Sequence, residues 1–598
     1  MKRFPALLLC AISLICAICG CSYAESSVAD TVVYGNVITM DDANPTAEAV
    51  AIKDGIIVFV GSKEDAEAFV GENTQTLDYG GSSVYPGFLE AHTHGFFAGY
   101  RAVGQADLSG VFPTDYEVYG KIIGEFIAEH PDKDLYLAAG WVENEEYVTK
   151  AYMDEICSDK PLIMNTDGGH ACLLNTKALE WAGIDAAYAK EVGYDLVHVD
   201  ENGEPDGYIS EMPAIELIKS MPVTQEEKKN YLLQWQDFAI SKGFTAVADA
   251  GAELFCDDIS SVYHELEEEG KLKLRTYSYL LVPDNVEDPS GEIARIVKDR
   301  ESYSGEYYHI IGAKAFLDGT TEGHTAWQAW DYLDQPGYHG LERFNDHDKM
   351  VELITAAEAE DLSVHVHSIG GGATRFMLDC IEDAEKITGN LDQRNVMAHL
   401  EFVEPEDVIR MAETHTIPAV APLWTPKFNG EYELEASYVG QEHVDNCYPI
   451  RSFYDAGACV VFHSDYPISP NIGVQNNVYM AELRAVPEEE NGGLSTQRNI
   501  KEAVTRMQSL RAMTTNVAYA WRQEDRMGSL EVGKLANLTV CSCDFLNDDA
   551  AAVANADVVA TIIDGKEVYH KRHFQDGVGS IFYGNKQTSS AVGSGKDR

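Results

Sequence analysis

The stretch Val84-Tyr85-Pro86-Gly87-Phe88-Leu89-Glu90-Ala91-His92-Thr93-His94 decides the fold of this 598-residue chain. It is an apolar, strand-like run that ends in two histidines one residue apart. In an extended strand, residues i and i+2 point to the same face, so His92 and His94 direct both imidazoles to one point. A divalent metal needs that arrangement from two of its ligands. For a pair taken alone, the alternative is two histidines in a surface loop.

Three later apolar runs also end in residues that bind metals. The first ends at His365 and His367, the second at His399, and the third at His463-Ser464-Asp465. Helix-sized stretches separate them, and alternating strands and helices form a parallel sheet. In a (β/α)8 barrel the active site lies at the carboxyl ends of the strands. We therefore predict an α/β fold, a TIM barrel, with these residues gathered at its mouth around a shared metal site.

The barrel is expected over residues 84–520, with an inserted subdomain at about 95–230, where there is more sequence than one βα unit needs. The flanking segments 31–83 and 521–575 each contain a hairpin that turns at Asp-Gly. Neither segment can bury a core alone, so we predict that both chain ends pair into one small β-sandwich. Residues 576–598 are expected to form a flexible tail.

The first 20 residues have the pattern of an export signal, because two basic residues precede an apolar stretch that is shorter than the ~20 residues of a membrane span. The sequence Ile18-Cys19-Gly20-Cys21 resembles the lipobox of bacterial lipoproteins. That resemblance implies cleavage before Cys21, a lipid on its thiol, and a tether over 21–30. The expected location is then the extracytoplasmic face of the cell membrane. The alternative is a secretory signal cut near Ala24.

Charge and cysteines exclude several classes of function. Lysine and arginine number 44 against 98 aspartate and glutamate residues, a formal net charge of −54. Such acidity argues against nucleic-acid binding and against electrostatic docking on anionic lipid, so membrane attachment depends on the lipid at Cys21. The eight cysteines beyond Cys21 contain no CxxC pair. An exported protein can oxidise some of them, and the sequence does not assign which would pair.

Taken in order, these motifs resemble the amidohydrolase superfamily, and within it amidohydrolase family 3, the group of N-substituted formamide deformylase-like hydrolases. The run 84–94 resembles the strand-1 motif PGF-x-(D/E)-x-HTH. Three positions depart from the usual pattern: Gly371 replaces an aspartate, Ala398-His399-Leu400 replaces Glu-His-Ala, and His463 replaces a glycine. The other stretches that carry the resemblance are Gly140-Trp141, residues 167–179, Lys314–Gly319, His367–Gly370, Ser464-Asp465 and Gly528–Leu538.

The resemblance implies a metal site with ligands from five strands. Nitrogen and oxygen donors of this kind suit zinc best, with manganese, iron and nickel as alternatives, and one or two ions are expected. Lys314 as an ammonium cannot ligate. In related binuclear enzymes this lysine is carbamylated and bridges two metals; the alternative is an ion-pairing lysine beside a single metal. The implied ligands are His92, His94, Lys314, His367, His399 and Asp465.

Four other histidines compete for roles at the site. His365 shares a strand face with His367, and only the Ser-Ile-Gly that follows favours His367. His463 faces either the site or a packed core. His170 lies in a glycine-flanked loop, where the default is a structural hydrogen bond, although the resemblance implies contact with substrate and a catalytic role. His324, in a loop over the barrel mouth, is a weaker candidate.

The implied reaction is hydrolysis of a non-peptide carbon–nitrogen bond in a small molecule, such as an amide, N-formyl group or cyclic amide. The metal lowers the pKa of its bound water toward ~7, and Asp465 passes the water's proton to the leaving nitrogen. Ester hydrolysis, deamination and a lyase step are alternatives on the same barrel. A non-catalytic ligand-binding surface lipoprotein is another, against which the filled ligand set argues. Besides the substrate, the expected partners are the membrane and, in a homo-oligomer, a second copy of the chain.

Overall fold

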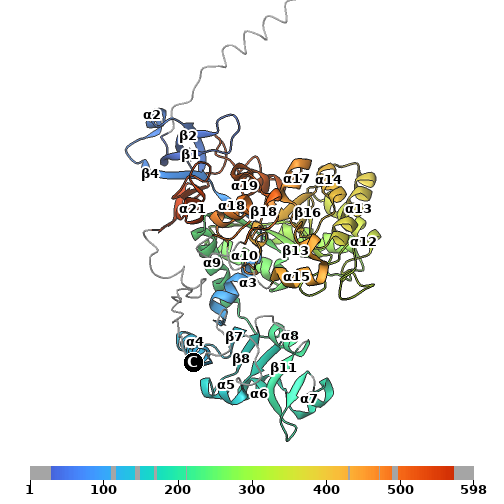
Figure 1. Ribbon diagram of the computed structural model, residues 1–598. Helices are drawn as coiled ribbons and strands as arrows, with labels where there is room; N and C mark the ends of the chain where they lie inside the picture. The colour runs from blue at the N-terminus through green and yellow to red at the C-terminus, as the bar shows by residue number, and fades with distance from the viewer. Residues whose placement is uncertain are drawn as a thin grey trace, which may run out of the picture.

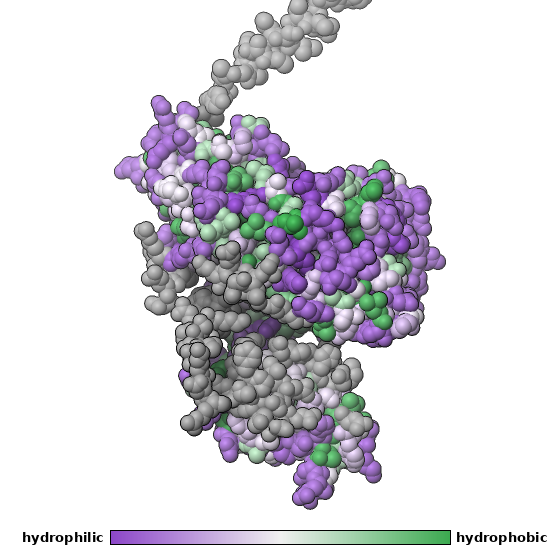
Figure 2. Space-filling model, viewed as in Figure 1, coloured by the Kyte–Doolittle hydropathy of each residue, from purple (hydrophilic) through white to green (hydrophobic). Residues whose placement is uncertain are grey.

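The computed structural model describes residues 28–571 except 109–115, 142–148, 167–170, 195, 211, 429–430, 470–471 and 488–495. The expected signal, the lipidation site Cys21, the expected tail and His170 therefore lie outside the described residues. Figure 1 shows a barrel with a smaller β domain at one side and a separate lobe below it. The face of the barrel visible in Figure 2 is mostly hydrophilic, in keeping with the acidic composition.

An eight-stranded parallel sheet forms the barrel and confirms the predicted fold class. Each strand is followed by at least one helix, such as α10 (Ile259–Glu268) after β12 and α11 (Pro289–Tyr303) after β13. Buried apolar residues of several barrel strands, among them Ala246, Ala248 and Tyr279, form one core cluster. In order around the sheet, the strands are β5 (Phe88–Thr93), β12 (Phe244–Ala250), β13 (Arg275–Leu281), β14 (Tyr308–Phe316), β15 (Ser363–Ser368), β16 (Val396–His399), β17 (Ile417–Val420) and β18 (Val461–Phe462).

The barrel closes at its carboxyl-terminal mouth. Strand β18 has only two residues, and the segment after it reaches β5 through two backbone hydrogen bonds. The Asp465 N–H donates to the His92 carbonyl at 3.0 Å, and the His94 N–H donates to the Tyr466 carbonyl at 2.9 Å. The closing seam therefore consists of the segments that carry three of the predicted ligands.

Strands from both chain ends form one seven-stranded sheet, as predicted for the β-sandwich. The two parts meet where Val84 of β4 lies opposite Val540 of β19, and apolar residues of both, such as Val50 and Ile562, share one core. The sheet order is β21 (Lys566–His570), β20 (Val558–Ile563), β19 (Leu538–Cys541), β4 (Gln75–Pro86), β1 (Thr31–Ile38), β2 (Thr46–Lys53) and β3 (Ile56–Gly61).

The run 84–94, expected to begin the barrel as one strand, is instead divided between two sheets. Residues up to Pro86 end β4 of the sandwich, and Phe88 begins β5 of the barrel. Gly87 joins the two strands. A larger residue would clash at this position, because a Cβ there would lie 2.2 Å from the Thr245 hydroxyl oxygen. Proline has no N–H for the ladder, so Pro86 is a natural end for a strand.

The inserted lobe has a six-stranded sheet of its own between Ala106 and Ser210 and two apolar cores. Helix α3 (Gly95–Gly99) leads into it and packs closely on α9 (Gln225–Ser241), where a Cβ on Gly99 would lie 1.9 Å from the Tyr231 carbonyl oxygen. The sheet order is β10 (Val197–Val199), β11 (Pro205–Ser210), β9 (Ala171–Leu174), β8 (Leu162–Thr166), β7 (Tyr136–Trp141) and β6 (Ala106–Asp107).

Two further observations concern the whole described chain. Among the described residues, no helix has both the length and the apolar character needed to cross a membrane. The eight cysteines in this part of the chain are free thiols.

Candidate metal centre

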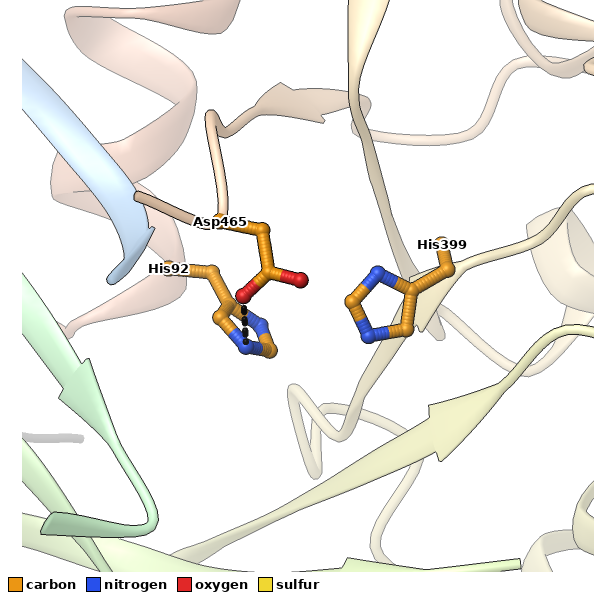
Figure 3. A group of neighbouring side chains, drawn as sticks. All are labelled: His92, His399 and Asp465. Carbon is orange, nitrogen blue, oxygen red and sulfur yellow. Dashed lines mark ion pairs between the residues drawn. The ribbon is translucent and has the colours of Figure 1, made fainter. Parts of the chain in front are cut away.

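Three buried side chains from distant parts of the sequence converge inside the barrel mouth (Figure 3). His92 comes from the end of β5, His399 from the end of β16, and Asp465 from the segment after β18. One nitrogen or oxygen of each lies within 4.8 Å of the others. Two imidazoles and a carboxylate at this spacing can hold one divalent cation.

Asp465 lies between the two histidines of strand β5. Its Oδ1 is 3.3 Å from His92 Nε2 and 3.1 Å from His94 Nε2. The backbone of Asp465 has a φ of 57°, a left-handed conformation that turns the chain sharply after β18. Behind it, one oxygen of the buried Glu90 accepts the N–H groups of His92 and Ser464 at 3.3 and 2.9 Å. Glu90 thus fixes the backbone of both ligand segments.

His367, which is partly buried, pairs with the fully buried Asp318 at the ends of β15 and β14. The His367 Nδ1 lies 2.9 Å from Asp318 Oδ1, and the His367 ring is 4.5 Å from the His399 ring. Asp318 also accepts backbone N–H groups from Trp327, Ile369 and Gly370. A carboxylate that holds one ring nitrogen in this way leaves Nε2 as the available donor, a common arrangement for metal-binding histidine.

His365, which competed with His367 as a candidate ligand, contacts the ligand histidine His92. Its Nε2 lies 3.0 Å from Nδ1 of His92, and its side chain is fully buried. Strand pairing places His365 level with Lys314, one layer below His367. The geometry therefore favours His367 for a place among the ligands and gives His365 contact with a ligand histidine instead.

His463 lies inside the barrel. Its ring stacks on that of His92 at 5.1 Å and is 5.2 Å from that of His399. Burial lowers the pKa of His463 to about 4, so the ring is neutral at physiological pH. The sequence left open whether His463 packs in the core or faces the site. Its contacts show that it adjoins the proposed ligands His92 and His399.

Lys314 is fully buried, and within the described part of the chain its Nζ has no hydrogen-bond partner. Burial lowers the pKa of Lys314 to about 7, although the charge of Asp465 opposes the shift. A substantial fraction of this amine is therefore neutral at physiological pH, which is the form that reacts with carbon dioxide. Both readings of Lys314, carbamylated bridge and ion-pairing amine, are compatible with this position.

The site collects unprotonated donors whose polar atoms lack partners. Burial lowers the pKa of His92, His365 and His399 well below the usual value, so these rings are neutral. Burial by itself would raise the pKa of Asp465, but neighbouring His94 and His463 and Lys314 hold it below its usual value. Among the described residues, His94 Nδ1, His399 Nδ1 and Asp465 Oδ1 have no hydrogen-bond partner. A cation is the group that such a set lacks, because buried polar atoms are normally satisfied.

The remaining two candidates from the sequence are His170 and His324. His170 lies outside the described residues, so its role stays a prediction. His324 has its Nε2 2.9 Å from Asp334, in the loop after β14. Two residues that support the ligands, Glu90 and Asp318, were not proposed from the sequence. Their signal was present, since Glu90 stands two residues before His92 and Asp318 follows the Lys314 strand.

Comparison with known proteins gives the family. Residues 75–569 match the model of the amidohydrolase family. The chain belongs to this family and is a hydrolytic enzyme. It is 26% identical to the protein LONG AFTER FAR-RED 3 of Arabidopsis thaliana over 91% of this chain and 92% of the relative. It is 25% identical to the N-substituted formamide deformylase of Arthrobacter pascens over 90% and 98%.

Solved structures agree with the fold. An uncharacterized metal-dependent hydrolase from Pyrococcus furiosus superposes with a TM-score of 0.68 at 22% identity, over 86% of this chain and 100% of that one. That solved structure therefore shares the fold over most of this chain.

Proposed function

We propose that this amidohydrolase is a metal-dependent enzyme that hydrolyses a non-peptide carbon–nitrogen bond of a small molecule. His92, His94, His367, His399 and Asp465 would hold the divalent cation, and zinc suits these donors best. The observation that carries the proposal is the buried carboxylate of Asp465, whose Oδ1 lies 3.3 Å from His92 Nε2 and 3.1 Å from His94 Nε2. The names of the formamide deformylase and of the metal-dependent hydrolase also support it.

When bound, the metal supplies an activated water and polarises the substrate carbonyl. Asp465 has a pKa below its usual value, so it is ionised at neutral pH and can accept a proton. Its position beside the ligands allows it to take the proton from water and to deliver it to the leaving nitrogen. Burial lowers the pKa of His92 and His399 well below the usual value, so these two imidazoles retain the lone pairs that ligation needs. Lys314 would help to hold the metal if it is carbamylated, and otherwise it would stay an amine beside the metal.

The experiment combines metal analysis with a substrate screen. Protein purified without chelators should contain at least one equivalent of a transition metal, measured by elemental analysis. The zinc-loaded enzyme is then tested on N-formyl amines, N-acyl amines and cyclic amides, with matched esters and amino-heterocycles for the rival reactions. Less than about half an equivalent of metal that added zinc does not restore would refute metal dependence. Turnover of the esters or amino-heterocycles alone would refute the carbon–nitrogen assignment.

A further inference from the structure

A pocket opens beside the metal centre at the ends of strands β13 and β14. Its volume is about 340 Å³, within the range of small-molecule sites. Its walls are mainly apolar, with Leu254, Leu281, Val282 and Phe316 among them, and its charged groups are Arg343 and Asp284. A mainly apolar pocket with few charged groups is typical of a site that recognises one polar group on a small ligand.

Phe316 separates this pocket from the proposed ligands. Phe316 and Lys314 are two residues apart on one strand, so both point into the barrel. The Phe316 ring lies 5.4 Å from the His367 ring on one side, and Cζ of Arg343 lies 4.7 Å from its centroid. Arg343 is therefore at most about 10 Å from the His367 ring, a distance that a small substrate can span.

Arg343 is held in place but has its terminal nitrogens free. Its backbone N–H donates to the Leu317 carbonyl at 2.9 Å, which fixes the segment to the end of β14. Its Nε donates to Asp284 Oδ2 at 2.7 Å, and its guanidinium lies over Phe316. Within the part of the chain that the structure describes, neither Nη atom donates a hydrogen bond to a protein group. A guanidinium fixed in this way presents two parallel N–H groups, which match a carboxylate.

We propose that Arg343 binds a carboxylate of the substrate, so that the enzyme acts on small amides that also carry a carboxylate. The proposal rests on the proposed function, because it places the amide carbonyl at the metal centre and the carboxylate in the pocket. Asp284 already offsets part of the positive charge, which favours a singly charged planar anion over a phosphate. A chain with a net charge of −54 repels anions, so a dedicated cation at the mouth is needed to retain one.

Binding and turnover are measured separately. Phenylacetate and phenylacetone have nearly the same shape and differ in charge, and neither has a bond that the proposed reaction would hydrolyse. Their binding to the zinc-loaded enzyme is followed by ligand-observed NMR. The wild-type enzyme should bind phenylacetate about 10-fold or more tightly than phenylacetone. Arg343→Gln should remove this preference and leave phenylacetone binding unchanged, and Arg343→Lys should retain only part of it. Arg375→Gln, an arginine paired with Asp407 on the outside of the barrel, is the control.

Turnover uses N-acetylleucine and N-acetylleucinamide, a second pair that differs in the carboxylate. Arg343→Gln should raise KM for the acid by about 10-fold or more and leave that for the amide unchanged. Equal binding of the two phenyl compounds by the wild-type enzyme, binding of neither, or a phenylacetate affinity unaffected by Arg343→Gln would overturn the proposal. If neither acetyl compound is hydrolysed while the phenylacetate preference depends on Arg343, the carboxylate site stands and the proposed reaction is what fails.

Discussion

At the scale of single residues, Asp465 combines two roles, because it adjoins both strand-β5 histidines and is the proposed proton shuttle. Asp465→Asn keeps the size and one ligating oxygen but cannot accept a proton near neutral pH. We expect metal content to fall little and turnover to fall by ~10²-fold or more, measured by elemental analysis and steady-state kinetics. His92→Ala should lose metal and activity together. Near-normal turnover by Asp465→Asn would show that another residue transfers the proton, and His170 would then be tested.

Asp318 acts through His367 rather than on the substrate. Asp318→Asn removes the charge that orients the imidazole, and we expect metal affinity to fall by about 10- to 100-fold, the usual effect of losing such a partner. A competition titration with a coloured chelator measures it. Asp334→Asn is the matched control, since Asp334 pairs with His324 outside the ligand set. Equal affinities in both variants would show that the His367–Asp318 pair is structural only.

Much of the candidate site was predictable because its residues follow apolar runs that end at one edge of a parallel sheet. His92, His399 and Asp465 were found in this way, and the structure brings them together. The choice between His365 and His367 was not predictable from spacing, because both lie on one strand face. It depends on Asp318 and His92, partners from other strands. The Arg343 pocket gave no signal for the same reason, since Asp284 and Phe316 approach it only in the folded chain.

At the scale of elements, helix α9 begins with a capping box that also carries an ion pair. Glu227 accepts the Thr224 N–H, and its Oε1 is 2.6 Å from Lys133 Nζ. Burial alone would raise the pKa of Glu227, but Lys133 and Thr224 hold it below its usual value of 4.5. The stabilisation from its charge is therefore present above that usual value and is lost as pH falls through the lower folded-state pKa.

Glu227→Gln keeps the capping geometry and removes only this charge. We expect the variant to be less stable than the wild type at pH 7 by less than about 1 kcal/mol, because the pair is partly exposed. The difference should shrink toward zero as pH falls below about 4. Urea unfolding followed at a series of pH values measures it, with the exposed Glu301→Gln as the control. A difference independent of pH would show that the change disturbs the cap rather than the ion pair.

Short-range elements were predictable and their boundaries less so. The hairpins at Asp54-Gly55 and Asp564-Gly565 could be expected because Asp-Gly suits the backbone of a tight turn, and both form. The junction at Gly87 could not, because the need for glycine there comes from Thr245, more than 150 residues away. The strand order within the inserted lobe depends in the same way on contacts between distant strands.

At the scale of the whole molecule, metal binding should stabilise the fold, because the ligands come from β5, β15, β16 and the segment after β18. We expect removal of the ion by a chelator to lower the melting temperature and added zinc to restore it, measured by calorimetry. A ligand at 100 times its Kd stabilises the folded state by about 2.7 kcal/mol. The His92→Ala variant should show no response to zinc. A response of the same size in that variant would place the ion at another site.

We also propose that the mature enzyme is anchored through a lipid on Cys21, which the sequence predicts. Cys21→Ser should move the protein from the membrane fraction to the soluble exported fraction, followed by fractionation and immunoblotting. Cys157→Ser, a buried cysteine of the inserted lobe, is the control and should leave the distribution unchanged. An unchanged distribution of the Cys21 variant would show that the lipobox resemblance is accidental.

The seam between His92 and Asp465 has a consequence for biosynthesis. The hydrogen bonds that close the barrel join segments more than 370 residues apart, and they hold both sides of the metal centre. A nascent chain therefore has no complete metal centre until residue 465 has left the ribosome. The β-sandwich cannot form until β19 and β20 have also been synthesised. Truncated chains and stalled translation products should be inactive and should expose the open edge of β5, where unpaired strands aggregate. Activity in a cell thus shows that synthesis has passed residue 465.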